Sequence, residues 1–193
     1  MSALPPARRA VFLDRDGTII EEAGYPDRLE RLVLFPYTVD AVRTLNAGGF
    51  VVIVVSNQSG VARGIVPERF VAEAHAYLSD RMRAGGARID AFYYCPHHPD
   101  AVEPALRGPC DCRKPQAGLL RRAAADFGLD LPRSFVVGDR WQDLAAGQAV
   151  GAAGVLVRTG VGREHERRED GRVPGSVIAD DLAAAAAWIL HQA

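Results

Sequence analysis

The run FVVIVV at residues 50–55 constrains the fold more than any other stretch of this sequence. Every side chain in it is apolar and all but the first are β-branched, so it lacks the alternation of a strand with one solvated face. A strand that is apolar on both sides must be covered on both faces, which is typical of a central strand in a parallel sheet. Parallel strands need crossover connections, usually helices, so the rest of the chain should alternate between strand and helix.

The sequence shows this alternation. Short apolar runs predict further strands at 10–14, 89–95, 134–138 and 154–158. Helical spacing of apolar residues, with glycine and proline at the ends, predicts helices at 37–47, 67–84, 116–127 and 142–150 and from about 180 onward. A long proline-rich loop is predicted at 96–115, and a charged, solvated loop at 162–173. The pattern predicts an α/β fold, with an open, mostly parallel, doubly wound sheet.

Composition narrows the classes of function. The net charge is −1 and no long basic run occurs, which disfavours a nucleic-acid partner. The longest apolar runs are the size of strands, so we expect no membrane span. The first ten residues, MSALPPARRA, lack the apolar core of a secretory signal, and we expect a cytoplasmic protein. We predict one domain over residues 1–193, monomeric because no exposed apolar stripe is evident.

Carboxylates follow the predicted strands at the points where the strands end. Asp14 and Asp16 lie in DRDGT after the first strand, and Asp139 lies in GDRWQD after the fourth. The carboxyl ends of parallel strands meet at one edge of the sheet, where ligands bind. Carboxylates gathered there suit Mg²⁺, since like charges this close need a cation or a proton. Asp143, in the same stretch as Asp139, could act in the site or support it from behind.

A single lysine, Lys114, stands among 23 basic residues, directly after a Cys-x-Cys. Lysine is a compact point charge that fits between a carboxylate and a phosphoryl oxygen, whereas arginine is a wide planar fork. A carboxylate can attack phosphorus, and the transferring oxygens then need positive charge. Mg²⁺, Lys114 and backbone N–H groups would supply it. We therefore predict that Lys114 is functional.

Cysteine and histidine form two tight pairs, Cys95-x-His97 and Cys110-x-Cys112, with twelve residues between them. Three thiolates and one imidazole complete a tetrahedral zinc site and leave no position for a catalytic water. The predicted zinc is therefore structural and folds the loop at 95–112. His98 could ligate in place of His97, and free thiols are the alternative.

The motifs FLDRDGT, VVSNQSG, RKP and GDRWQD, in this order across residues 10–160, resemble those of the haloacid dehalogenase superfamily of phosphohydrolases. The resemblance implies a Rossmann-like fold with Asp14 as nucleophile and Asp16 as general acid and base. It also implies that Ser56 hydrogen-bonds the phosphoryl group and that Lys114 neutralises it. Mg²⁺ would then be held by the Asp14 and Asp139 side chains and the Asp16 carbonyl, with Asp143 behind them.

The zinc loop narrows the resemblance to the bacterial heptose bisphosphate phosphatases and the histidinol-phosphate phosphatases. SNQSGVARG, YYCPHHP and CDCRKP, and the twelve-residue gap, are most similar to the heptose enzymes. That similarity implies removal of the 7-phosphate of D-glycero-D-manno-heptose 1,7-bisphosphate, on the route to nucleotide-activated heptose for lipopolysaccharide. Histidinol phosphate or another sugar phosphate is the alternative substrate, and a non-catalytic, zinc-organised binding module is a more distant reading. The preferred C1 anomer stays open.

The zinc loop also bears on access to the site. It ends immediately before Arg113 and Lys114, so it would position both side chains and cover the site in place of a large cap domain, for which no insertion is evident. Arg113 suits the second phosphate because a guanidinium binds phosphate with two hydrogen bonds. The chain reads EAGY at 22–25 where relatives often carry Asp-His before the Gly-Tyr, so the sugar contacts there stay open. The substrate contacts that the resemblance implies are Glu22, Ala23, Gly24, Tyr25, Ser56, Asn57, Gln58, Ser59, Arg113, Lys114 and Arg140.

Overall fold

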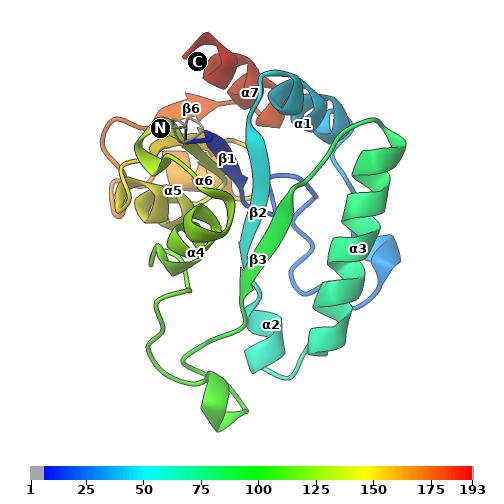
Figure 1. Cartoon of the computed structure of the whole chain (residues 1–193). Coiled ribbons are helices and arrows are strands. Elements are labelled where there is room, and N and C mark those ends of the chain that lie inside the picture. Colours follow the sequence, from blue (N-terminus) through cyan, green and yellow to red (C-terminus); the bar gives the residue numbers. More distant parts are fainter. Residues whose placement is uncertain (1–6, 193) are drawn as a thin grey trace, which may run out of the picture.

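A sheet of six parallel strands forms the centre of the protein (Figure 1). The structure is a computed structural model that describes residues 7–192. The strand order is β3-β2-β1-β4-β5-β6, which confirms the predicted open parallel sheet. The strands are β1 (Ala10–Leu13), β2 (Val51–Asn57), β3 (Ala91–Cys95), β4 (Phe135–Gly138), β5 (Ala153–Val157) and β6 (Val177–Ala179).

Helices cover both faces of this sheet. The α-helices are α1 (Thr38–Ala47), α2 (Ser59–Ala62), α3 (Glu68–Ala84), α4 (Gly118–Phe127), α5 (Trp141–Gln148), α6 (Gly162–Glu166) and α7 (Leu182–His191). Helices α1, α3 and α7 share one apolar cluster with the sheet, and α4 and α5 lie on the opposite face. None of the helices in the described part of the chain is long and apolar enough to cross a membrane.

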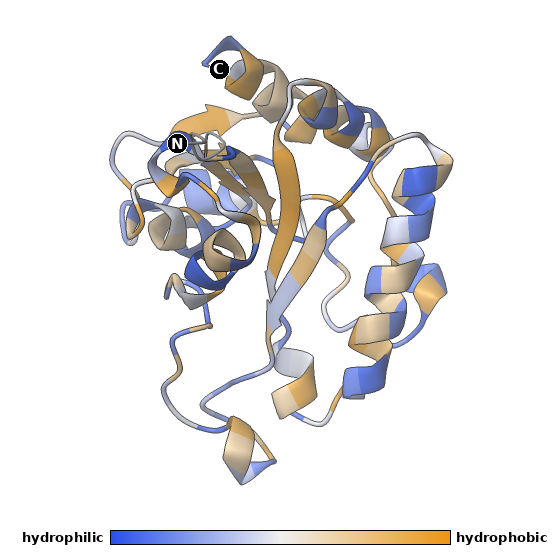
Figure 2. Ribbon diagram, in the orientation of Figure 1, coloured by the Kyte–Doolittle hydropathy of each residue, from blue (hydrophilic) through white to orange (hydrophobic). Residues whose placement is uncertain are grey.

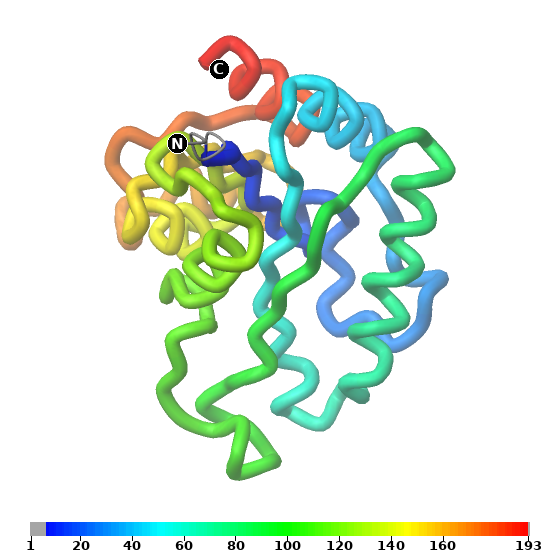
Figure 3. The backbone as a smooth tube through the Cα atoms, in the orientation of Figure 1, coloured from blue at the N-terminus to red at the C-terminus, as the bar shows by residue number. Residues whose placement is uncertain are grey.

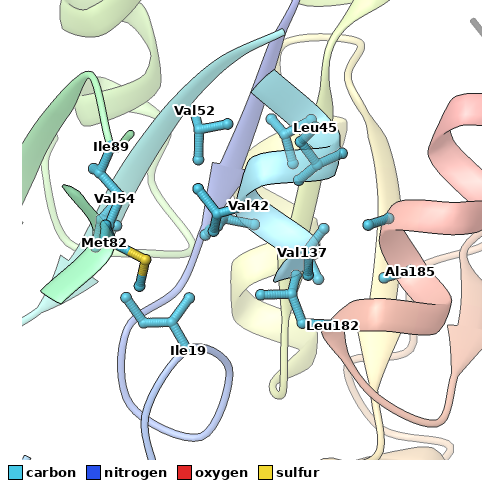
Figure 4. Packing of buried hydrophobic residues seen from close by; sticks show 14 of the residues in the cluster. Ile19, Val42, Leu45, Val52, Val54, Met82, Ile89, Val137, Leu182 and Ala185 are labelled. Atoms are coloured by element: carbon cyan, nitrogen blue, oxygen red, sulfur yellow. The ribbon is translucent and has the colours of Figure 1, made fainter. Parts of the chain in front are cut away.

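The burial of β2 explains why its sequence does not alternate. Val52 and Val54 point into the cluster under α1 and α3, whereas Val51, Ile53 and Val55 point into the cluster under α4. All five are at most 2% exposed, and burying each such side chain stabilises the fold by about 1.5–3 kcal/mol. Figure 2 shows β2 as hydrophobic over most of its length. Figure 4 shows the first cluster, where helices and strands contribute Val42, Leu45, Val52, Val54, Met82, Val137, Leu182 and Ala185.

The chain changes direction across the sheet at β1. This strand pairs with β2 on one side and with β4 on the other. Ligands bind at such a point, beyond the carboxyl ends of the strands. The loop between β3 and α4 runs out from this end of the sheet and returns to it (Figure 3). In residues 7–192 no connection between strands carries more than two α-helices, which agrees with the predicted lack of a large cap domain.

Three short elements differ from the sequence-based expectations. Helix α6 occupies part of the segment 162–173 that was expected to be a loop, and neither β6 nor α2 was predicted. Each has five residues or fewer, too short to carry a periodic pattern. The prediction of a single domain stays a prediction. The expected lack of a signal rests partly on residues 1–6, which with residue 193 lie outside the described part.

Candidate active site

The single lysine is buried between two carboxylates at the carboxyl end of β1, where the chain changes direction across the sheet. Lys114 is 4% exposed, and its Nζ lies 2.5 Å from Asp14 Oδ1 and 2.7 Å from Asp143 Oδ1. The Lys114 ammonium also donates to the carbonyl of Val55 at 2.8 Å. Burial alone would lower the pKa of Lys114, but the charges of Asp14 and Asp143 outweigh it and raise the pKa. Lys114 therefore stays charged at neutral pH.

Asp14, Asp139 and Asp143 form a carboxylate cluster in which one oxygen of each lies within 4.8 Å of the others. Burial raises the pKa of Asp14 to about 7, although Lys114 opposes the shift. Burial, together with the charges of Asp14 and Asp143, raises the pKa of Asp139 to about 8. Such carboxyl groups hold negative charge at neutral pH only with a counter-ion, so the cluster fits a hard divalent cation.

The contacts of the cluster distinguish Asp139 from Asp143. Asp143 Oδ1 forms an ion pair with Lys114 Nζ at 2.7 Å, and Asp143 Oδ2 accepts from the backbone N–H of Arg140 at 3.1 Å. Asp139 Oδ2 accepts from the backbone N–H of Val161 at 2.9 Å. Asp139 Oδ1 is buried and accepts no hydrogen bond from the described residues, and the Arg140 Nε atom lies 3.7 Å away from it. Asp139 is therefore better placed than Asp143 to bind a metal.

Asp16 is held by two side chains that approach from different directions. Arg15 donates to both of its oxygens at 3.0 Å, and Gln58 donates to Oδ2 at 3.1 Å. Arg15 is 1% exposed, which makes this a nearly buried ion pair. The Asp16 side chain is therefore not a member of the Asp14–Asp139–Asp143 cluster, and it lines the cleft.

Residues at the carboxyl end of β2 also contribute to the site. Ser56 is buried, and its hydroxyl has no hydrogen-bond partner among the described residues. Asn57 donates to the carbonyl of Lys114 at 3.1 Å and accepts from its N–H at 3.0 Å. This reciprocal pair fixes the backbone of Lys114 to β2, which explains how a residue from a long loop reaches the centre of the site.

A cleft of about 350 Å³ opens above these groups. It falls within the usual range of small-molecule sites. Of the substrate contacts implied by sequence, most line this cleft, whereas Ala23 and Ser56 do not. Those that line it are Glu22, Gly24, Tyr25, Asn57, Gln58, Ser59, Arg113, Lys114 and Arg140.

Positively charged and aromatic groups form the rim of the cleft. The Arg140 Nη2 atom pairs with Glu22 Oε2 at 3.1 Å, which joins the loops that follow β1 and β4. Arg63 donates to the Tyr25 hydroxyl at 2.9 Å. The Arg113 guanidinium donates to the carbonyl of His97 at 3.1 Å. Arg113 is thus attached to the loop that carries the cysteines.

The predicted zinc ligands lie together. One atom each of Cys95, His97, Cys110 and Cys112 lies within 4.8 Å of the others. The Cys95 Sγ atom is 3.7 Å from that of Cys110 and 3.1 Å from that of Cys112, and His97 Nδ1 is 3.2 Å from Cys112 Sγ. Thiolates bound to one zinc ion at about 2.3 Å would lie about 3.8 Å apart. The Cys95–Cys110 distance matches this spacing, and the Cys95–Cys112 distance is shorter than it. The donor set of three thiols and one imidazole, gathered at this range, fits a zinc ion.

His98 is directed elsewhere. Its Nδ1 accepts from the backbone N–H of Asp100 at 3.1 Å, and the residue lines the cleft. The geometry favours His97 as the fourth ligand.

Sequence reasoning missed Arg15 and the apolar wall of the cleft. Arg15 stands between the two aspartates of DRDGT, and that position was the only signal for it. The apolar wall is formed by Val66, Phe70 and Val71, at the start of α3 and in the segment before it. In the sequence these residues look like ordinary core residues, so no pattern distinguished them.

The fold and the site define a hydrolase of the haloacid dehalogenase type. Residues 111–185 match the model of the HAD-hydrolase-like family. A D-glycero-beta-D-manno-heptose-1,7-bisphosphate 7-phosphatase of Rhodopseudomonas palustris is 42% identical over 154 residues, which cover 80% of this chain and 86% of that protein. A D-glycero-D-manno-heptose-1,7-bisphosphate 7-phosphatase of Thermosynechococcus vestitus is 43% identical over 187 residues, 94% of this chain and 95% of that one. This chain belongs to the family of heptose-1,7-bisphosphate 7-phosphatases.

A solved structure supports the same assignment. The D,D-heptose 1,7-bisphosphate phosphatase from B. bronchiseptica, complexed with magnesium and phosphate, superimposes with a TM-score of 0.86 at 31% identity. The match covers 96% of this chain and 99% of that one. The family and fold predicted from the motifs are thereby confirmed.

Proposed function

We propose that this protein hydrolyses the 7-phosphate of D-glycero-D-manno-heptose 1,7-bisphosphate. The observation that carries the proposal is the buried Asp14–Lys114 pair, beside a carboxylate cluster at the floor of a cleft with a basic rim. Family membership supplies the substrate class, a small sugar bisphosphate. Nothing in the proposal requires a second subunit. The expected monomeric state and the expected cytoplasmic location both stay predictions.

In the first half of the reaction, a carboxylate oxygen of Asp14 attacks phosphorus. A bond forms between that oxygen and phosphorus, and the bond from phosphorus to the sugar oxygen breaks. Asp16 in its protonated form, which the second half of each turnover regenerates, donates its proton to the departing oxygen. This step requires Asp16 to exchange part of its pairing with Arg15 and Gln58 for the substrate. Lys114 and the Ser56 hydroxyl bind the phosphoryl oxygens, where negative charge gathers.

In the second half, water cleaves the aspartyl-phosphate. Asp16, now a carboxylate, takes a proton from the water as its oxygen bonds to phosphorus. The bond to Asp14 breaks, and inorganic phosphate leaves. Asp14 and Asp139 side chains and the Asp16 carbonyl would hold Mg²⁺, which supplies positive charge beside the transferring phosphoryl group.

The basic rim would hold the second phosphate. Arg113 and Arg140 both line the cleft and lie on separate loops, so they can hold a phosphate at a distance from the reacting one. A structural zinc in the Cys95–Cys112 cluster would fix the loop that delivers Arg113 and Lys114.

Phosphate release with Mg²⁺ tests the proposal. The substrates are both C1 anomers of the heptose bisphosphate and histidinol phosphate, and the proteins are wild type, Asp14→Asn and Asp40→Asn. Asp40 is an exposed carboxylate on α1 and serves as the matched control. We expect turnover of a heptose anomer by wild type and the control, with none by Asp14→Asn.

Other outcomes have distinct meanings. Turnover of histidinol phosphate alone would keep the chemistry and replace the substrate. No turnover of any substrate, with both metals bound, would favour the non-catalytic binding module.

A further inference from the structure

We infer that the loop after β5, Thr159–Gly160–Val161, is a positioning device that fixes the Asp139 carboxylate so that Oδ1 faces the cation. The inference rests on the proposed role of Asp139 as a Mg²⁺ ligand. Neither the motifs nor the proposed mechanism gives this loop a role.

The loop touches the site at two hydrogen bonds. The backbone N–H of Val161 donates to Asp139 Oδ2 at 2.9 Å, and the Thr159 hydroxyl donates to the carbonyl of Gly17 at 2.6 Å. The first bond occupies one oxygen of the carboxylate, and Oδ1 is left as the buried oxygen without a hydrogen bond. The second ties the loop to the DRDGT turn that carries Asp14 and Asp16.

Two glycines confine the same carboxylate. A Cβ atom on Gly17 or on Gly160 would lie 2.2 Å from Asp139 Oδ2, far inside van der Waals contact. A Cβ on Gly160 would also lie 2.6 Å from the Cα atom of Gly17. Both glycines have positive φ, +81° and +55°, which other residues rarely adopt. The carboxylate thus lies in a slot whose walls are backbone.

The residue before the loop anchors it. Arg158 donates to both oxygens of Glu166 on α6, at 2.7 and 2.8 Å, and to Asp180 Oδ1 at 2.6 Å. These ion pairs fix the start of the loop to α6 and to the segment before α7. The hydrogen bonds of Thr159 and Val161 then fix the position of the site residues relative to the loop. Outer contacts of this kind orient metal ligands and commonly change metal affinity by about 10–100-fold when removed.

The test measures Mg²⁺ binding directly, by calorimetry on the zinc-loaded full chain without substrate. Thr159→Val removes the hydroxyl with little change in shape, Thr159→Ser restores it, and Gly160→Ala puts a methyl group into the slot. Thr44→Val is the matched control, because Thr44 donates a similar hydrogen bond, at 2.7 Å, within α1.

We expect the Mg²⁺ dissociation constant to rise about tenfold in Thr159→Val and about 100-fold in Gly160→Ala. Thr159→Ser should stay within about twofold of wild type, and Thr44→Val should match wild type. In Thr159→Val, kcat should recover at saturating Mg²⁺ while the substrate KM is unchanged.

Wild-type Mg²⁺ affinity in both Thr159→Val and Gly160→Ala would overturn the inference. So would a loss of thermal stability in Thr159→Val with unchanged Mg²⁺ affinity, which indicates a purely structural role. If the wild type binds Mg²⁺ but releases no phosphate, and Thr159→Val still weakens the metal, the proposed reaction fails and the inference stands. If the wild type binds no Mg²⁺, the inference fails as well.

Discussion

Lys114 Nζ lies 2.5 Å from Asp14 Oδ1, although 100 residues separate the two along the chain. The contact exists because β1 and the end of the long loop converge on one edge of the sheet. The Asn57 side chain hydrogen-bonds to the backbone of Lys114 there, and Asp143 forms a second ion pair with the Lys114 ammonium group. The position needs a charge that fits between two buried carboxylates, which explains why it holds the only lysine of the chain.

Lys114→Arg should lower kcat by at least about 100-fold, because the guanidinium fork does not fit the space of an ammonium group. Lys114→Met should lower kcat similarly. It should also destabilise the fold by about 3–5 kcal/mol at pH 8, since it leaves Asp14 and Asp143 buried without a partner. Steady-state kinetics and urea unfolding measure the two effects. Arg121→Met, at an exposed position on α4, is the control. Activity of Lys114→Arg within tenfold of wild type would contradict this account.

Removal of zinc should free the loop between β3 and α4. We expect one zinc ion per chain. After chelation, trypsin should cut at Arg107, whose side chain donates two hydrogen bonds to the carbonyl of Ala101 in the folded loop. Phosphatase activity should fall in parallel, since Lys114 follows the loop directly.

Histidine variants check the assignment of the zinc ligands. His97→Ala should lose zinc and become sensitive to trypsin, whereas His98→Ala should keep both zinc and resistance. The reverse pattern would make His98 the ligand.

The stability of the metal-free protein should fall as pH rises. The pKa of Asp14 is raised to about 7 and that of Asp139 to about 8, from 3.8. The folded state therefore holds protons that the unfolded state has released, and the free energy of unfolding should decrease between about pH 4 and pH 8. Urea unfolding in EDTA at pH 5, 6, 7 and 8 measures this slope.

Mg²⁺ should reverse the trend by stabilising the ionised carboxylates. Its stabilising effect should be larger at pH 8 than at pH 5. Asp139→Asn removes one of the two groups and should reduce the slope in EDTA. An equal slope in that variant would mean that other groups dominate.

Glu22→Gln should lower the KM for the bisphosphate by about two- to fivefold. The Glu22–Arg140 pair is partly exposed, with side-chain exposures of 26% and 37%, and pairs of this kind contribute about 0.2–1 kcal/mol. Its loss frees Arg140 for the second phosphate. Arg140→Gln should raise KM, and kinetics on both variants check the pair. A higher KM in Glu22→Gln would show that Glu22 positions Arg140 or contacts the sugar.

The sheet and the carboxylate cluster were predictable from the sequence for the same reason. FVVIVV predicted cover on both faces and hence a parallel sheet, in which the carboxyl ends of the strands lie at one edge. Asp14, Asp139 and Lys114 were therefore expected to lie close together. The spacing of the cysteines likewise predicted the cluster with His97.

The directions of side chains on loops were not predictable. An arginine in a turn, such as Arg15, is typical of a solvent-exposed residue, and its burial depends on how distant segments pack over it. The expected contact of Ser56 with substrate stays a prediction: its hydroxyl is buried without a hydrogen-bond partner among the described residues. The Glu22–Arg140 pair joins two loops, and the distance between these loops depends on the tertiary fold, which no local sequence pattern predicts.

The place of β1 between β2 and β4 also sets an order of events during synthesis. Asp14, the proposed nucleophile, is made early, but one edge of β1 has no partner until residues 135–138 have left the ribosome. Lys114 arrives only shortly before. A nascent chain released before β4 would therefore expose an open strand edge and could not form the centre of its active site, so the protein is expected to complete its fold near the end of translation.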